Sequence, residues 1–149
     1  MEMTDQSCEQ WRVVLFTDAA GMAVTAMDDL LRTHGHRLVG VVTSPGPRAR
    51  RSRTYLDVVE AARPGIDVIV SNHPSRWAAM LAPLRPDLII SLGFLWMIPE
   101  DVISLPRLGA YNTHGGLLPR GRGPNPTGWA FRNDEGELGW TIHRVDTGL

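Results

Sequence analysis

Short, almost wholly apolar segments alternate with helix-type segments along this chain, and this alternation strongly limits the folds open to it. Apolar runs typical of buried strands cover residues 12–16, 36–43, 65–71, 87–93 and 109–114, and a sixth strand begins within 139–145. Strands that are apolar on both faces need cover on both faces, which helices between parallel strands provide. The sequence therefore predicts an α/β fold: a Rossmann-like, mostly parallel sheet with helices on both faces.

Helices are expected between these strands. Six residues recur at helical spacing after the first strand: Met22, Ala23, Ala26, Met27, Leu30 and Leu31. Thr54 and Asp57 are spaced as a capping box for a second helix, and Ser75 is a candidate N-cap for a third. Pro99 suits the first residue of a helix of one or two turns, and residues 127–133 predict another short helix.

Length and composition are those of one soluble domain. The chain has 149 residues, which predicts a single domain over residues 12–149 after a flexible N-terminal tail of residues 1–11. The formal net charge of -1 does not favour nucleic acid or an anionic membrane surface. The polar N-terminus does not resemble a secretory signal, and the single cysteine, Cys8, suggests a reducing compartment. We therefore expect a cytoplasmic protein that does not bind membranes.

An amide and an imidazole stand two residues apart at the end of the fifth strand. On a strand, residues i and i+2 share a face, so Asn112 and His114 should point the same way and Thr113 the opposite way. An amide N–H can stabilise an oxyanion, and an imidazole can accept a proton near neutral pH. The pair therefore suits acyl transfer, with the alternative that both side chains only hydrogen-bond the following loop.

Other sites common in this fold class have no support in the sequence. The first turn, "FTDAAGMA" (16–23), lacks G-x-G-x-x-G, which weakens the alternative of a nucleotide-binding oxidoreductase. No G-x-S-x-G segment supplies a serine nucleophile. The chain has no lysine for Schiff-base chemistry. No cysteine cluster or H-x-x-x-H spacing accompanies the histidines, so we expect no metal site.

Three ordered segments resemble those of one enzyme family. The segment "NTHGGLLPRGRGPNP" (112–126) resembles the N-x-H-x-S-L-L-P-x-x-x-G signature of the folate-dependent formyltransferases. These include methionyl-tRNA formyltransferase, glycinamide ribonucleotide transformylase and the sugar N-formyltransferases. Upstream, "SLGFLWMIPEDVISLPRLGAYN" (91–112), and downstream, "GWTIHRVDTGL" (139–149), are also similar to that family. The resemblance implies formyl transfer from 10-formyltetrahydrofolate to a primary amine.

The resemblance also implies roles for particular residues. Asn112 would stabilise the oxyanion of the tetrahedral intermediate, and His114 would assist proton transfer from the amine. For His143, a structural role on the strand is at least as well supported as a direct role in the reaction. The pterin pocket of the donor would be lined, largely by backbone groups, by Leu95, Trp96, Met97, Ile98 and Val145. The alternative for these residues is ordinary packing at the strand end. This alternative suits Met97 better than the large Trp96.

The chain departs from the family pattern in two places. The family's third catalytic residue is an aspartate that would fall at position 150, one past Leu149, and Asp146 does not match it. An orienting carboxylate of this kind can be worth about 10⁴-fold in rate. We therefore expect the chain as given to be an N-terminal portion of such a domain, inactive or nearly so. Where the signature often has serine, this chain has Gly116, which gives the backbone more freedom.

The acceptor amine is not identified by the sequence. Arg120 and Arg122, beside the dyad, could hold phosphates of an amino sugar nucleotide or a carrier-bound amine, and residues 44–53 form a second basic loop. A tRNA acceptor would require a further domain, and a homodimer remains open. Two alternatives stay on the same scaffold: a 10-formyltetrahydrofolate hydrolase, and a non-catalytic folate- or partner-binding remnant.

Overall fold

Six strands form one sheet in the computed structural model, which describes residues 9–46 and 53–147. The strands are β1 (Arg12–Phe16), β2 (Arg37–Thr43), β3 (Asp67–Val70), β4 (Leu88–Leu92), β5 (Ala110–His114) and β6 (Thr141–Arg144). Their order across the sheet is β3-β2-β1-β4-β5-β6. The first five are parallel and β6 is antiparallel to β5, which confirms the mostly parallel sheet. Most of the expected tail and of the basic loop lies outside the described residues.

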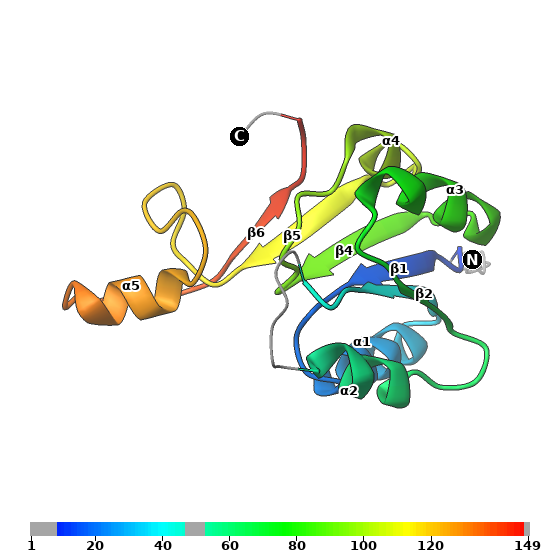
Figure 1. Cartoon of the computed structure of the whole chain (residues 1–149), viewed down its shortest axis with the longest axis horizontal. Coiled ribbons are helices and arrows are strands. Elements are labelled where there is room, and N and C mark those ends of the chain that lie inside the picture. Colours follow the sequence, from blue (N-terminus) through cyan, green and yellow to red (C-terminus); the bar gives the residue numbers. More distant parts are fainter. Residues whose placement is uncertain (1–8, 47–52, 148–149) are drawn as a thin grey trace, which may run out of the picture.

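Helices cover both faces of this sheet (Figure 1). They are α1 (Met22–Thr33), α2 (Thr54–Ala61), α3 (Trp77–Leu81), α4 (Glu100–Ile103) and α5 (Pro126–Arg132), with 3₁₀ turns at Pro74–Arg76 and Ala82–Leu84. Helices α1 and α2 lie together on one face, and α3 and α4 lie on the other. Helix α5 projects away from the sheet. No helix in the described part of the chain is long and apolar enough to cross a membrane.

The two faces of β1 enter two separate apolar cores. Val13 and Leu15 pack with Val24 of α1 and Val58 of α2. Val14 and Phe16 pack on the opposite face, in the cluster that contains two large residues of α3, Trp77 and Leu81. Because successive strand residues point to opposite faces, a run that is apolar at every position fits a sheet covered on both sides. This arrangement leaves the strand ends to form the site.

Several helix ends differ from the sequence expectation. Thr54 does not cap α2: it is the first helical residue, and its hydroxyl donates to the Asp18 backbone carbonyl at 3.2 Å. Ser75 does not cap α3, because it lies inside the 3₁₀ turn Pro74–Arg76. Pro99 precedes the first residue of α4 rather than being it. Both cap predictions were wrong: the Thr54 hydroxyl binds the distant Asp18, which spacing alone does not show, and the 3₁₀ turn moves the start of α3 to Trp77, two residues past Ser75.

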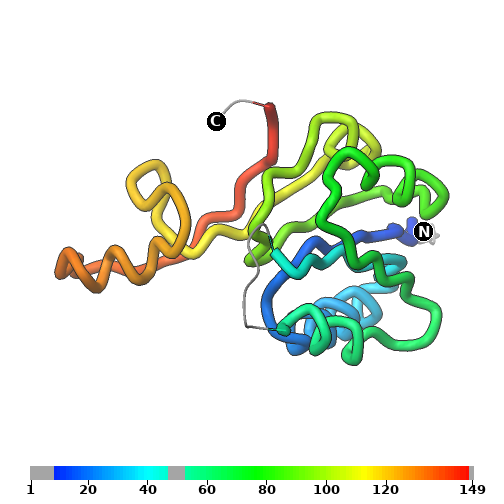
Figure 2. Tube along the Cα trace, viewed as in Figure 1, coloured from blue at the N-terminus to red at the C-terminus, as the bar shows by residue number. Residues whose placement is uncertain are grey.

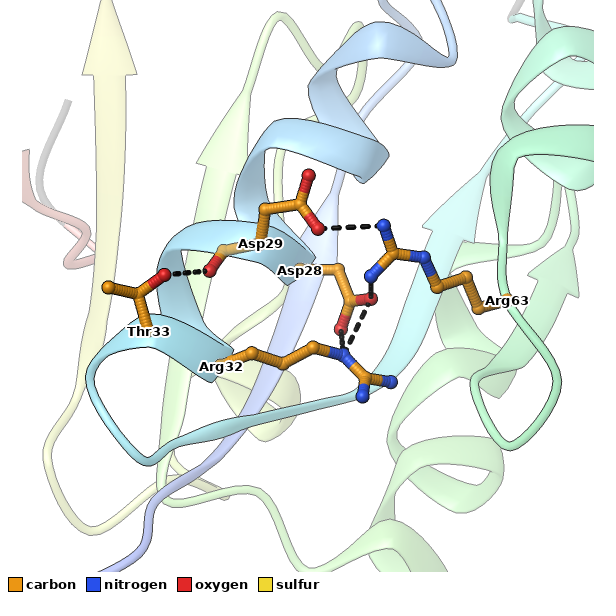
Figure 3. A network of polar contacts seen from close by, with 5 residues as sticks. All are labelled: Asp28, Asp29, Arg32, Thr33 and Arg63. Carbon is orange, nitrogen blue, oxygen red and sulfur yellow. Dashed lines mark hydrogen bonds and ion pairs between the residues drawn. The ribbon is translucent and has the colours of Figure 1, made fainter.

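The buried face of α1 includes a carboxylate. Met22 and Leu30, part of the apolar spacing, are 78% and 56% exposed, whereas Asp28 is 2% exposed. Asp28 accepts hydrogen bonds from Arg32 at 3.0 Å and from Arg63 at 2.9 Å (Figure 3). Arg63 also binds Asp29, and this hydrogen bond and charge raise the pKa of Arg63. Two arginines thus satisfy a carboxylate that would otherwise be costly to bury.

Asp87 gives the fold a testable pH dependence. A hydrogen bond from the Arg12 backbone N–H at 2.8 Å, with a further contribution from Arg107 at 2.7 Å, lowers the pKa of Asp87. A carboxylate whose pKa is lower in the folded state stabilises that state above its unfolded pKa, about 4, and less as the pH falls through the folded value. Asp87→Asn is therefore expected to lower the free energy of unfolding by about 1 kcal/mol at pH 7.

The same loss should disappear in acid. Urea unfolding of wild type and Asp87→Asn, measured from pH 7 down to below the lowered pKa of Asp87, checks this expectation. Asp67→Asn is the control, since Asp67 is an exposed carboxylate at the start of β3. A wild-type advantage that stays constant across this pH range would contradict the role assigned to the Asp87 charge.

Candidate active site

The candidate site lies at the edge of the sheet formed by the carboxyl ends of its parallel strands. The strand order reverses there, between β1 and β4. Ligands of open α/β sheets bind at the carboxyl ends of the strands, near such a reversal. Residues 93–98 follow β4 there, and the segment from 115 to 139 leaves the sheet after β5 and returns as β6 (Figure 2). The stretches singled out in the sequence therefore share one edge.

The dyad lies on one face of the β5–β6 pair. Asn112 is opposite His143 and His114 is opposite Thr141 in the antiparallel register. Directly opposed residues share a face, so these four side chains lie on the same side of the sheet and Thr113 lies on the other. The geometry thus agrees with the predicted common orientation of Asn112 and His114.

His143 contacts the amide of the dyad. Its Nδ1 lies 3.0 Å from the Arg144 carbonyl oxygen and its Nε2 lies 3.2 Å from Asn112 Nδ2. A carbonyl can only accept, so Nδ1 carries the proton, and Nε2 of the neutral ring accepts one N–H of the Asn112 amide. Asn112 thereby gains a fixed orientation and retains a second N–H. The sequence left this histidine between a structural and a direct role, and the structure shows it in contact with the Asn112 amide.

His114 is held by the loop that follows it. Its Nε2 lies 2.6 Å from the carbonyl oxygen of Gly121. Because the carbonyl is an acceptor, Nε2 donates, and Nδ1 of the neutral ring carries the lone pair. The alternative reading of the dyad, hydrogen bonding to the loop backbone, is therefore partly realised in His114. That contact also fixes which ring nitrogen can act as a base.

Gly116 lets the loop fold closely around His114. A Cβ at this position would lie 2.7 Å from the Gly121 carbonyl oxygen and 2.8 Å from Pro126 Cβ. A serine, usual in the signature, would collide with the carbonyl that binds His114 in this loop conformation. Thr141 tethers the same loop, since its hydroxyl donates to the Gly116 carbonyl at 2.7 Å and accepts from the Leu118 N–H at 3.1 Å.

An open cavity of about 560 Å³ lies among the loop after β5, α5 and the segment that returns to β6. Asn112 and His114 do not line it, but His114 binds the carbonyl of Gly121, which does. Arg120 and Arg122 both line it, together with Trp129 and the backbone of Gly115 and Gly116. The structure therefore brings the two predicted acceptor-binding arginines to the same hollow, directly after the dyad in the chain.

Side chains alternate in direction along the segment after β4. Trp96 and Ile98 are half-buried and pack against the core of β1, together with Phe94, whereas Leu95 and Met97 are 43% and 69% exposed. The expectation that packing suited Met97 better than Trp96 was wrong. The Trp96 indole is perpendicular to Trp77 at a centroid distance of 6.3 Å, because the alternation of the extended segment turns it inward.

The remaining residues fit less directly into the site. Val145 packs against the same core as Trp96, and its N–H donates to the Ala110 carbonyl at 2.8 Å. Asp146 is exposed. Over residues 9–46 and 53–147, no group of three or more His, Cys, Asp or Glu side chains is arranged to hold a metal ion.

Sequence reasoning missed Asp18 and Ser44, which lie after β1 and β2 at the same edge. Asp18 is 9% exposed, and its carboxylate accepts the Leu95 N–H at 3.0 Å. The Ser44 hydroxyl accepts the indole N–H of Trp96 at 2.9 Å. The available signal was the position of two polar residues within two positions of the ends of buried strands.

The comparisons with known proteins agree with this geometry. A model of the formyl transferase family matches residues 11–149. The chain belongs to the formyl transferase family. The resemblance found in the three sequence segments is thereby confirmed, and the family supports formyl transfer as the general chemistry.

Solved structures, among them two glycinamide ribonucleotide transformylases, share the fold of this chain. Glycinamide ribonucleotide transformylase 1 from Symbiobacterium toebii is 18% identical with a TM-score of 0.75, over 94% of this chain and 68% of that chain. The enzyme of that name from Geobacillus kaustophilus is 20% identical with a TM-score of 0.74, over 95% and 77%. A HypX variant from Aquifex aeolicus is 20% identical with a TM-score of 0.62, over 94% and 20%. These likenesses confirm the Rossmann-like fold class.

Proposed function

We propose that this chain moves the formyl group of 10-formyltetrahydrofolate to a primary amine on a small or carrier-bound acceptor. The observation that carries the proposal is the placement of Asn112 and His114 on one face of the end of β5, with His114 bound to the loop that lines an open cavity. The formyl group is already activated by its carrier, so direct attack by the amine needs only an oxyanion donor and a proton acceptor.

The hydrogen bonds of the dyad suggest how the two residues divide the reaction. The amine nitrogen attacks the formyl carbon, and the second N–H of Asn112 donates to the oxygen that becomes negative. Nδ1 of His114 takes the proton that the amine loses. The carbon–N10 bond then breaks, N10 of tetrahydrofolate takes a proton, and the N-formyl product leaves.

The segment after β4 supplies the proposed donor site. Leu95 and Met97 offer exposed side chains, whereas Trp96 and Ile98 offer main-chain groups because their side chains pack inward. Val145, at the start of the segment after β6, would close this site from the side of the dyad.

Formyl transfer and donor binding test the proposal separately. Tetrahydrofolate binding to the purified chain is measured first, by calorimetry without oxygen, because it does not need a complete set of proton-transfer groups. The chain, and any longer form of it, is then incubated with 10-formyltetrahydrofolate and a panel of amino sugar nucleotides and aminoacyl carriers. A formylated amine, identified by mass spectrometry, supports the proposal. Formate release without an acceptor would favour the hydrolase, and absence of folate binding would contradict both.

Arg122 provides a test of the acceptor site. The test uses a form of the protein that transfers formyl groups. Arg122→Ala is expected to raise the acceptor KM about tenfold and to leave the donor KM within about twofold. The reason is that Arg122 lines the cavity, whereas the proposed donor site is formed by residues 94–98. Steady-state kinetics with each substrate varied in turn give both constants. The exposed Arg132, on α5, supplies the control variant Arg132→Ala. The reverse ranking of the two KM changes would refute the acceptor role.

A further inference from the structure

A buried carboxylate lies where the strand order reverses, and neither the dyad nor the cavity uses it. Oδ1 of Asp18 accepts hydrogen bonds from the Thr43 hydroxyl at 3.2 Å and from the Ser44 N–H at 2.7 Å. Oδ2 accepts the Leu95 N–H at 3.0 Å, and the Ser44 hydroxyl lies within 3.2 Å of both oxygens. All of these donors are neutral, so the hydrogen bonds themselves must offset the burial of the charge.

These contacts join three strand ends. Asp18 follows β1, and Leu95 follows β4. Thr43 is the last residue of β2, and Ser44 is the first residue of the loop after it. The bond between Asp18 and Leu95 therefore spans the reversal between β1 and β4, which is the place where this fold class binds ligands. Ser44 extends the connection, because its hydroxyl also accepts the indole N–H of Trp96 at 2.9 Å.

The network decides which groups of the segment 94–98 remain for a ligand. The Leu95 N–H is taken by Asp18 and the Trp96 indole N–H by Ser44. The Trp96 ring is turned inward, and the side chains of Leu95 and Met97 are left exposed. A segment fixed at both a main-chain and a side-chain point has less conformational entropy to lose when a ligand binds.

The charged side chain at position 18 has a chemical reason. Both carboxylate oxygens accept hydrogen bonds, and one of them accepts the N–H of Leu95 while the other accepts that of Ser44. Asparagine has the same shape but one acceptor, so its amide group would face one of these N–H groups, donor against donor. A purely space-filling role would accept either residue.

We propose that Asp18 is a positioning residue for the donor-binding segment 94–98. It holds the main chain at Leu95 directly and the Trp96 indole through Ser44, so the outward side of the segment is ordered before the donor binds. This inference rests on the proposed function, because it takes residues 94–98 to be the donor site.

Asp18→Asn tests the proposal in the purified chain. Amide hydrogen exchange at Leu95 is measured by NMR, and tetrahydrofolate affinity by calorimetry. Loss of one hydrogen bond to a charged acceptor predicts that Leu95 exchanges about tenfold faster and that the Kd rises about tenfold. Should Asp18→Asn fail to fold, Ser44→Ala is the second variant. It removes the connection to Trp96, so the indole N–H signal should shift and the Kd should rise by a smaller factor.

Thr54→Val is the matched control. The Thr54 hydroxyl donates to the backbone carbonyl of Asp18 at 3.2 Å, so its removal disturbs the same residue without touching the carboxylate. Leu95 exchange and the Kd should both stay at wild-type values in this variant. Unchanged Leu95 exchange in Asp18→Asn, or an equal rise in Kd in both variants, would overturn the proposal. If wild type binds no tetrahydrofolate, the proposed function fails, and Leu95 exchange still decides whether Asp18 holds the segment.

Discussion

Asn112→Ala is expected to lower kcat for formyl transfer by about 10²–10³-fold, the effect of removing one donor from an oxyanion site. The test requires a form of the protein that transfers formyl groups. Asn112 donates one N–H to His143 at 3.2 Å and has a second N–H for the oxyanion. Because this bond matters only as negative charge develops, the donor KM should change little.

Two variants make the Asn112 result specific. Thr113→Ala changes the neighbouring residue on the opposite face of β5, so its kcat should stay close to wild type. His143→Ala removes the acceptor that orients the Asn112 amide, and its kcat should fall between those of Thr113→Ala and Asn112→Ala. Initial rates at saturating donor and acceptor give the comparison. A loss below tenfold in Asn112→Ala, or one confined to the donor KM, would contradict the oxyanion role.

Trp77→Ala is expected to lower the free energy of unfolding by about 3–5 kcal/mol, the usual effect of deleting a buried aromatic ring. Trp77 is 0% exposed and contacts Phe16, Phe94 and Trp96. The loss is a large part of the stability of an ordinary domain, about 5–15 kcal/mol. Urea unfolding followed by circular dichroism measures it.

The same residue offers a finer comparison. Trp77 Nε1 is buried without a hydrogen-bond partner among the described residues, so Trp77→Phe removes an unsatisfied donor as well as some contacts. It should therefore lose much less stability than Trp77→Ala. Trp140→Ala is the control: Trp140 is 67% exposed, and its replacement should change stability by no more than about 0.5 kcal/mol. Equal losses for Trp77→Ala and Trp140→Ala would contradict the packing described.

The elements of the site that depend on local pattern were predictable from sequence. Apolar runs predicted the strands, because a strand that is buried on both faces is apolar at nearly every position. The shared face of Asn112 and His114 follows from the two-residue period of a strand. The three family segments lie in the expected order and predicted the family correctly.

Contacts between residues far apart in the sequence could not be predicted from local pattern. The predicted cap at Thr54 was wrong, since the Thr54 hydroxyl binds Asp18, 36 residues away. Trp96 and Met97 exchanged their expected roles because the inward position depends on where the segment meets the core. Asp28 lies among apolar residues of α1 because Arg32, on the same helix, and Arg63, from beyond α2, both bind its carboxylate.

The sequence by itself determined the alternating α/β architecture, the family and the shared face of Asn112 and His114. Each of these depends on local periodicity or on contiguous segments. The tertiary structure alone decided that His143 orients Asn112, that Gly121 fixes the tautomer of His114, and that Asp18 and Ser44 hold the segment after β4. These are hydrogen bonds between residues brought together by strand order and register, and short-range sequence patterns carry no information about such partners.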